Sequence, residues 1–136
     1  MRNYGERKVL IGSIGVDSGQ VMVVDPCYLD KWKANEFSFE HGSDAPRHTE
    51  PTGTFDYDGA CHATCSEAGH GVLDLRPELG NRAQGTIGMA IASETQYGDG
   101  CYPVYAIYEG RNTRPSRLVI EFDESDEEND EEGYLL

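Results

Sequence analysis

Two cysteines and two histidines lie close together in the middle of the chain, at Cys61, His62, Cys65 and His70. Thiolate and imidazole are ligands that zinc prefers. The sequence predicts a strand over residues 60–65, in which Cys61 and Cys65 would share a face about 13 Å apart while His62 points the other way. Because one tetrahedral ion could not bind all three, buried cysteines and loop histidines are the favoured interpretation, and a zinc site is the alternative.

Three aspartates, Asp17, Asp25 and Asp99, fall in predicted turns near glycine or proline. A carboxylate in a turn commonly accepts a hydrogen bond from its own backbone, which is the favoured interpretation of Asp17 and Asp25. If the three turns met, the carboxylates could instead bind a divalent cation such as calcium, or act as an acid and base pair.

A loop with two glycines, residues 96–103, is the segment best suited to contact a ligand. Glycines on both sides of Asp99 permit positive φ angles, and Tyr97 and Tyr102 offer flat surfaces for a ring. The predicted ligand-binding residues are therefore Asp99, Tyr97, Tyr102, Asp25, Asp17 and Tyr28. A purely structural hairpin turn is an equally good interpretation of the loop.

No catalytic residue is assigned. A nucleophilic cysteine at Cys27 or Cys101 would need a histidine beside it, and none of the four histidines, His41, His48, His62 and His70, can be placed there from the sequence. We expect no resident cofactor, with zinc or calcium at the two sets above as the alternatives.

The elements that would position these residues are mostly short strands. Residues 8–14 and 20–24 suit a hairpin, residues 53–75 suit a meander, and the segments 102–108 and 117–122 suit a second hairpin. The predicted strands cover 8–14, 20–24, 53–57, 60–65, 71–75, 85–93, 102–108 and 117–122. With one short helix at 27–32 and a long loop at 34–52, the fold class is mainly β, an antiparallel sandwich or partly open barrel of about eight strands.

The length and charge of the chain suit one domain followed by a tail. The 136 residues carry a net charge of −14, and nine acids and no base lie in residues 121–132. Such a charge block normally stays solvated, so we expect a β-rich domain over 1–122 and an acidic flexible tail over 123–136. The basic residues are scattered and outnumbered, which argues against direct binding of nucleic acid.

The chain has no apolar stretch long enough to span a membrane and no secretory signal at its start. We therefore expect it to stay in the cytoplasm, where thiols are kept reduced and disulfides are rare.

Three strings together carry a family resemblance: Val16-Asp-Ser-Gly-Gln20, Asp25-Pro-Cys-Tyr28 and Gly98-Asp-Gly-Cys-Tyr-Pro-Val104. They resemble a family of small, uncharacterised proteins of actinobacterial phages, related to a bacterial domain of unknown function with a Gly-Asp-Gly-x-Tyr-Pro-Val signature. Residues 57–64 look like a further shared block, so the resemblance spans roughly residues 9–122. It implies a phage accessory protein in the host cytoplasm and brings no catalytic residue with it.

The leading function hypothesis is a non-enzymatic phage protein that binds a host or phage protein, or a small molecule such as a nucleotide. One alternative is a small hydrolase that uses the aspartates or a metal. Another is a virion component, either a decoration or a tail accessory protein.

Overall fold

The computed structural model describes residues 5–38, 51–76 and 87–123. They form a mainly β structure, as predicted, with six antiparallel strands in two three-stranded sheets and one short α-helix. Neither of these sheets closes into a barrel. The chain divides into two compact units. The terminal unit comprises the chain up to Gly19 and from Thr95 onward, and the central unit comprises Gln20–Glu94.

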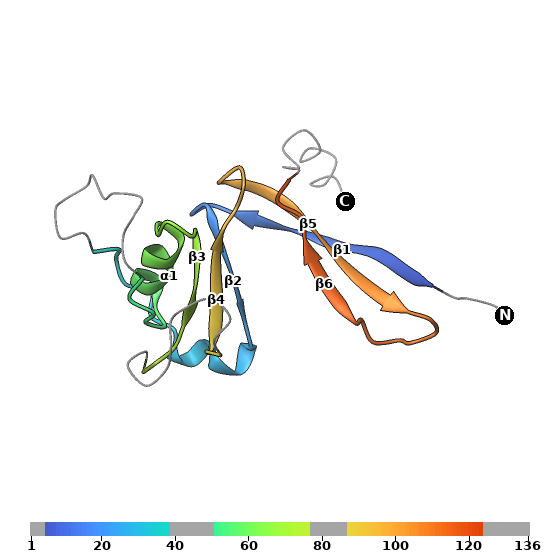
Figure 1. The fold of residues 1–136 in the computed structure, drawn as a ribbon, viewed down its shortest axis with the longest axis horizontal. Helices are drawn as coiled ribbons and strands as arrows, with labels where there is room; N and C mark the ends of the chain where they lie inside the picture. The colour runs from blue at the N-terminus through green and yellow to red at the C-terminus, as the bar shows by residue number, and fades with distance from the viewer. Residues whose placement is uncertain (1–4, 39–50, 77–86, 124–136) are drawn as a thin grey trace. The chain divides into compact units, whose positions relative to one another are not determined.

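The terminal unit contains one sheet in the order β1-β5-β6 (Figure 1). Its strands are β1 (Glu6–Val16), β5 (Gly100–Glu109) and β6 (Arg117–Ile120). All neighbours are antiparallel, and the register of β1 against β5 shifts between Leu10 and Gly12, which is a β-bulge. The predicted hairpin of residues 102–122 is confirmed by the pairing of β5 with β6.

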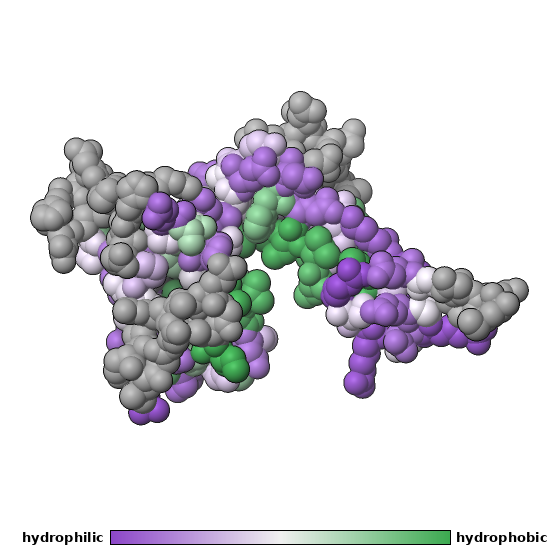
Figure 2. Space-filling model, viewed as in Figure 1, coloured by the Kyte–Doolittle hydropathy of each residue, from purple (hydrophilic) through white to green (hydrophobic). Residues whose placement is uncertain are grey.

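The two faces of the terminal sheet differ in polarity. Residues paired across strands point to the same side, so Val9, Ala106 and Leu118 form an apolar row across all three strands. Figure 2 shows hydrophobic residues gathered over β5 and β6. The next row, on the opposite face, joins Lys8, Ile107 and Arg117.

Ion pairs cover the polar face of this sheet. Lys8 pairs with Glu121 at 2.6 Å, and Arg117 pairs with Glu6. The Lys8 ammonium also lies 4.3 Å from the centre of the Tyr105 ring.

The central unit contains a sheet in the order β2-β4-β3, formed by β2 (Gln20–Val24), β4 (Ala90–Glu94) and β3 (His70–Leu73). The 3₁₀ helix η1 (Pro26–Lys31) follows β2, where a short helix is predicted, and the helix α1 (Tyr57–Thr64) precedes β3.

The core of the central unit lies between α1 and its sheet. Its buried members are Phe55, Ala60, Ala63, Leu73, Ala90 and Ala92, with the partly buried Tyr28 and Trp32 packed against them. The alanines of β4 and the absence of a side chain at Gly71 let the helix approach closely, since a Cβ at Gly71 would lie 3.0 Å from that of Ala63.

Two local predictions are wrong. Residues 8–14 and 20–24 are strands but do not form a hairpin, because β1 pairs with β5 and β2 pairs with β4. The turn between them is instead tied to a distant segment, since the Gly19 carbonyl accepts a hydrogen bond from the Thr95 amide at 3.1 Å.

The meander predicted over residues 53–75 is replaced by a helix. Residues 60–65 were expected to be a strand, yet α1 spans Tyr57–Thr64, and Thr54 and Asp56 form only isolated bridges. Part of the predicted long loop, residues 39–50, and the acidic tail from 124 onward lie outside the described residues.

Candidate functional site

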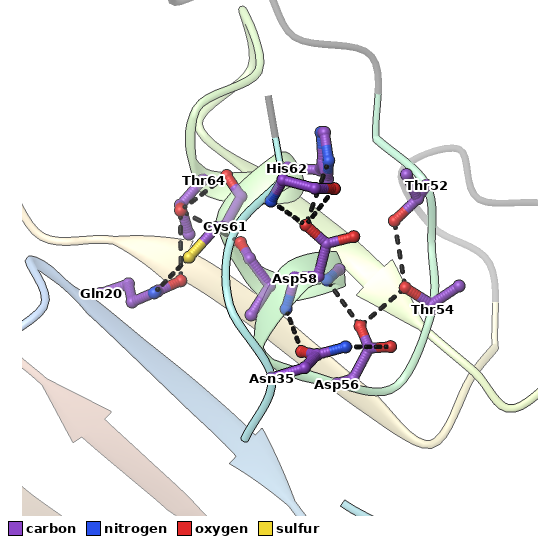
Figure 3. A network of polar contacts seen from close by, with 12 residues as sticks. Gln20, Asn35, Thr52, Thr54, Asp56, Asp58, Cys61, His62 and Thr64 are labelled. Carbon is purple, nitrogen blue, oxygen red and sulfur yellow. Dashed lines mark hydrogen bonds and ion pairs between the residues drawn. The ribbon is translucent and has the colours of Figure 1, made fainter. Parts of the chain in front are cut away.

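The densest network of polar contacts surrounds α1 in the central unit, and it begins at the cap of the helix (Figure 3). Asp56 is the N-cap residue, with an extended backbone. Its Oδ1 accepts hydrogen bonds from the Gly59 amide at 2.7 Å and from the Thr54 hydroxyl at 2.8 Å. An aspartate at this position satisfies an amide that the helix leaves without an internal partner, which is why α1 starts here.

Residues 35–38 are fastened to the same helix end. Asn35 donates to Asp56 Oδ2 at 3.2 Å, and its carbonyl oxygen accepts the amide of Asp58 at 2.8 Å. The amide and the hydroxyl of Ser38 both donate to Asp58 Oδ1, at 2.7 and 3.0 Å. These carboxylates are therefore engaged in holding residues 35–38 against α1.

His62 lies one turn after Asp58 on the helix. Its Nε2 is 3.4 Å from Asp58 Oδ1, and the Phe37 ring meets its imidazole edge to face at 4.8 Å. The Nδ1 atom is buried and has no hydrogen-bond partner within the described residues. The arrangement is that of a histidine and carboxylate pair packed under an aromatic ring.

Cys61 lies on the side of α1 that contacts β2. Gln20 donates to its Sγ at 3.4 Å and accepts from the Thr64 hydroxyl at 3.1 Å, so one amide bridges both side chains (Figure 3). A hydrogen bond with Cys61, together with burial, raises the pKa of the Tyr57 phenol. The phenol therefore stays protonated at neutral pH and can act only as a neutral donor or acceptor.

The four residues of the predicted zinc set have different surroundings. Cys61 is buried, Cys65 caps the end of α1, and His70 begins β3. Among the residues that the structure describes, no three His, Cys, Asp or Glu side chains are grouped so that they could hold a metal ion. The expected separation of about 13 Å between Cys61 and Cys65 assumed a strand. It does not apply, because the two residues are about one helical turn apart.

Two of the predicted ligand-binding segments come together in the terminal unit. A Cβ placed on Gly19 would lie 3.8 Å from Gly98 Cα and 4.0 Å from Asp99 Oδ1, so the turn of residues 17–19 touches the loop that carries Asp99. Gly19 and Gly98 both have positive φ, at 71° and 75°, as expected for such turns. The carboxylates of Asp17 and Asp99 are both exposed.

The two tyrosines of that loop differ. Tyr97 is 55% exposed, whereas Tyr102 is completely buried. The Tyr102 hydroxyl donates to the Gly98 carbonyl at 2.8 Å, and its ring packs against Phe122. Tyr97 therefore presents an accessible surface, and Tyr102 supports the loop from inside.

Asp25 and Tyr28 belong to the central unit. Asp25 caps η1, with its Oδ1 accepting the amide of Cys27 at 3.0 Å, which confirms the predicted bond to its own backbone. Partial loss of hydration raises the pKa of the Cys27 thiol, and the Asp25 carboxylate raises it further. The thiolate is thereby disfavoured, and so is nucleophilic chemistry at Cys27.

The sequence analysis missed Gln20, Asn35, Asp56 and Asp58 as members of a polar site. A signal for one of them was present, because an aspartate directly before an apolar residue, Tyr57, with a second acid in the following turn, Asp58, is typical of a helix start. The contacts of Gln20 and Asn35 join residues far apart in the sequence and carry no local signal.

Comparison of the chain with protein-family models, curated proteins and solved structures gave no match. No helix within the described ranges combines the length and apolar character needed to cross a membrane.

Proposed function

We propose that this chain is a non-enzymatic phage accessory protein that binds a protein of the bacterial host. The phage assignment rests on the family resemblance described above. The observation that carries the binding function is the apolar surface of the terminal sheet. On that face Val9 of β1 is 42% exposed and Leu118 of β6 is 64% exposed, with Ala106 of β5 between them.

Single exposed apolar side chains are common on protein surfaces, but apolar side chains that adjoin one another across the strands of one sheet face favour a docking surface. The bulge after Leu10 interrupts regular pairing along β1, which opposes the addition of another strand at that edge. We therefore infer that a partner would dock on side chains of the sheet rather than extend it.

Side chains of the types that could catalyse a reaction make structural contacts within the central unit, which supports binding over catalysis. Asp56 and Asp58 hold the chain around α1, and Asp25 caps η1. Cys61 receives its hydrogen bond from Gln20, and the described contacts of His62 are with Asp58 and Phe37. These contacts provide no cysteine and histidine pair of the kind that activates a thiol.

The test is affinity capture from an extract of actinobacterial cells with three variants. Val9→Asp and Leu118→Asp place a charge on the proposed surface, and Leu29→Asp is the matched control because Leu29 is an exposed leucine on η1. We expect the wild type and Leu29→Asp to retain one host protein in stoichiometric amount, and the other two variants to lose it.

Retention of the same protein by both surface variants would contradict the proposal. Hydrolysis of a nucleotide or peptide that disappears in Asp99→Ala would favour the hydrolase alternative, and stoichiometric presence in purified particles would favour a virion component.

A further inference from the structure

The connection between β5 and β6 in the terminal unit borders two adjoining hollows. One, of about 700 Å³, is lined by Arg7, Val9 and Tyr108 together with residues 110–113. The other, of about 390 Å³, is lined by residues 112–116, so the two share Asn112 and Thr113. Ligand sites for small molecules commonly have volumes in this range.

The two adjoining hollows together are called the groove below. Its lining is positively charged, whereas the protein as a whole is negatively charged. The lining contains Arg7, Arg111 and Arg114 and no aspartate or glutamate, whereas the chain has 25 acids against 11 bases. This local concentration of positive charge on an acidic protein favours an anionic ligand.

Arg7 is held in place without a carboxylate partner in the described contacts. Its guanidinium donates to the Asn112 carbonyl at 2.7 Å and lies over the Tyr108 ring, 5.1 Å from the ring centre. Neither contact neutralises its charge. Lys8 and Arg117, in contrast, pair with Glu121 and Glu6. A guanidinium that is fixed but not neutralised keeps donors for a further acceptor.

The remaining lining suits a ring. Val9 is 42% exposed, and Tyr108 is partly buried beside it on the apolar face of the sheet. One guanidinium can donate two parallel hydrogen bonds to a phosphate group, and tyrosine rings and guanidinium groups stack on flat rings. We propose that this groove binds a nucleotide, with its phosphates on Arg111 and Arg114 and its base beside Arg7, Tyr108 and Val9.

This proposal goes beyond the protein-binding function above and does not depend on it, because it is tested on the purified full chain alone. Calorimetric titration would compare ATP and GTP with adenosine, inorganic phosphate and a short single-stranded oligonucleotide. We expect a nucleotide to bind more tightly than adenosine and than inorganic phosphate.

Three variants locate the site. Arg111→Gln combined with Arg114→Gln is expected to weaken nucleotide binding by at least about tenfold, because both phosphate contacts are lost. Tyr108→Ala is expected to weaken nucleotide binding more than phosphate binding. Arg76→Gln is the control, because it removes one positive charge from an exposed arginine of the central unit. It is expected to leave nucleotide binding unchanged. Circular dichroism would confirm that each variant is folded.

Equal affinity of the double variant and the wild type would overturn the proposal, as would the absence of nucleotide binding at millimolar concentration. Tighter binding of the oligonucleotide than of any mononucleotide would also overturn it, in favour of a nucleic-acid site.

Discussion

The carboxylate of Asp56 joins three parts of the central unit. It accepts hydrogen bonds from Thr54, from the Gly59 amide in the first turn of α1 and from the Asn35 side chain. Asp25 also caps a helix, but its described hydrogen bond is to the amide of Cys27, two residues along the chain. Residues of one type in similar turns therefore support the fold to different extents.

Replacing Asp56 by alanine is expected to lower the free energy of unfolding by about 1–2 kcal/mol, the usual cost of losing an N-cap, with further loss from the Asn35 contact. Urea unfolding followed by circular dichroism measures it. The control is Asp30→Ala, because Asp30 is exposed on η1. An Asp56 variant as stable as this control would show that the cap is dispensable.

At the scale of elements, the strands rich in β-branched and aromatic residues were predictable, and α1 was not. The segments of β1, β2, β5 and β6 all lie where residue type and alternation placed strands. Residues 57–64 combine alanine, which favours a helix, with glycine, threonine and tyrosine, which do not, so intrinsic preference gives no clear assignment. The cap that Asp56 provides and the packing of the helix against Ala90 and Ala92 decide in favour of a helix.

The candidate sites were predictable to a smaller extent, because their contacts span long separations. Gln20 meets Cys61 and Asn35 meets Asp56 across stretches of chain that a single sequence cannot pair. The contact between the turn of residues 17–19 and the Asp99 loop is likewise set by the pairing of β1 with β5.

Gly59 shows how closely α1 is fitted to its surroundings. Alanine normally stabilises a helix relative to glycine by about 1 kcal/mol. Here a Cβ would overlap the carbonyl oxygen of Thr54, so Gly59→Ala is expected to destabilise the protein by about 1–3 kcal/mol in urea unfolding. Gly15→Ala in β1 is the control, since a Cβ there meets nothing within 4 Å. A stabilised Gly59 variant would mean that the backbone shifts without cost.

At the scale of the whole molecule, both units carry groups that bind their protons more tightly when folded. A hydrogen bond with Glu121 raises the pKa of Lys8 in the terminal unit, and a hydrogen bond with Cys61 raises that of Tyr57 in the central unit. Because the folded state favours the protonated forms, this contribution is complete below the ordinary pKa values, near 10. It is lost as the pH rises through the folded-state values.

We therefore expect the urea midpoint to fall as the pH is raised above about 10, after allowing for the general effect of alkali on the chain. In Tyr57→Phe the decline should be smaller, because the titrating group is absent. A decline of the same size in the wild type and in this variant would exclude Tyr57 as a contributor.

The bulge in β1 has a consequence for how the chain can vary in length. Leu10 is opposite Tyr105 and Gly12 is opposite Val104, so Ile11 has no residue of its own on β5. Deleting a residue elsewhere in β1 would turn the rest of the strand over and exchange its apolar and charged faces. Deleting Ile11 would leave the pairs on both sides in register, so the strand can be shortened at the bulge without exchanging its two faces.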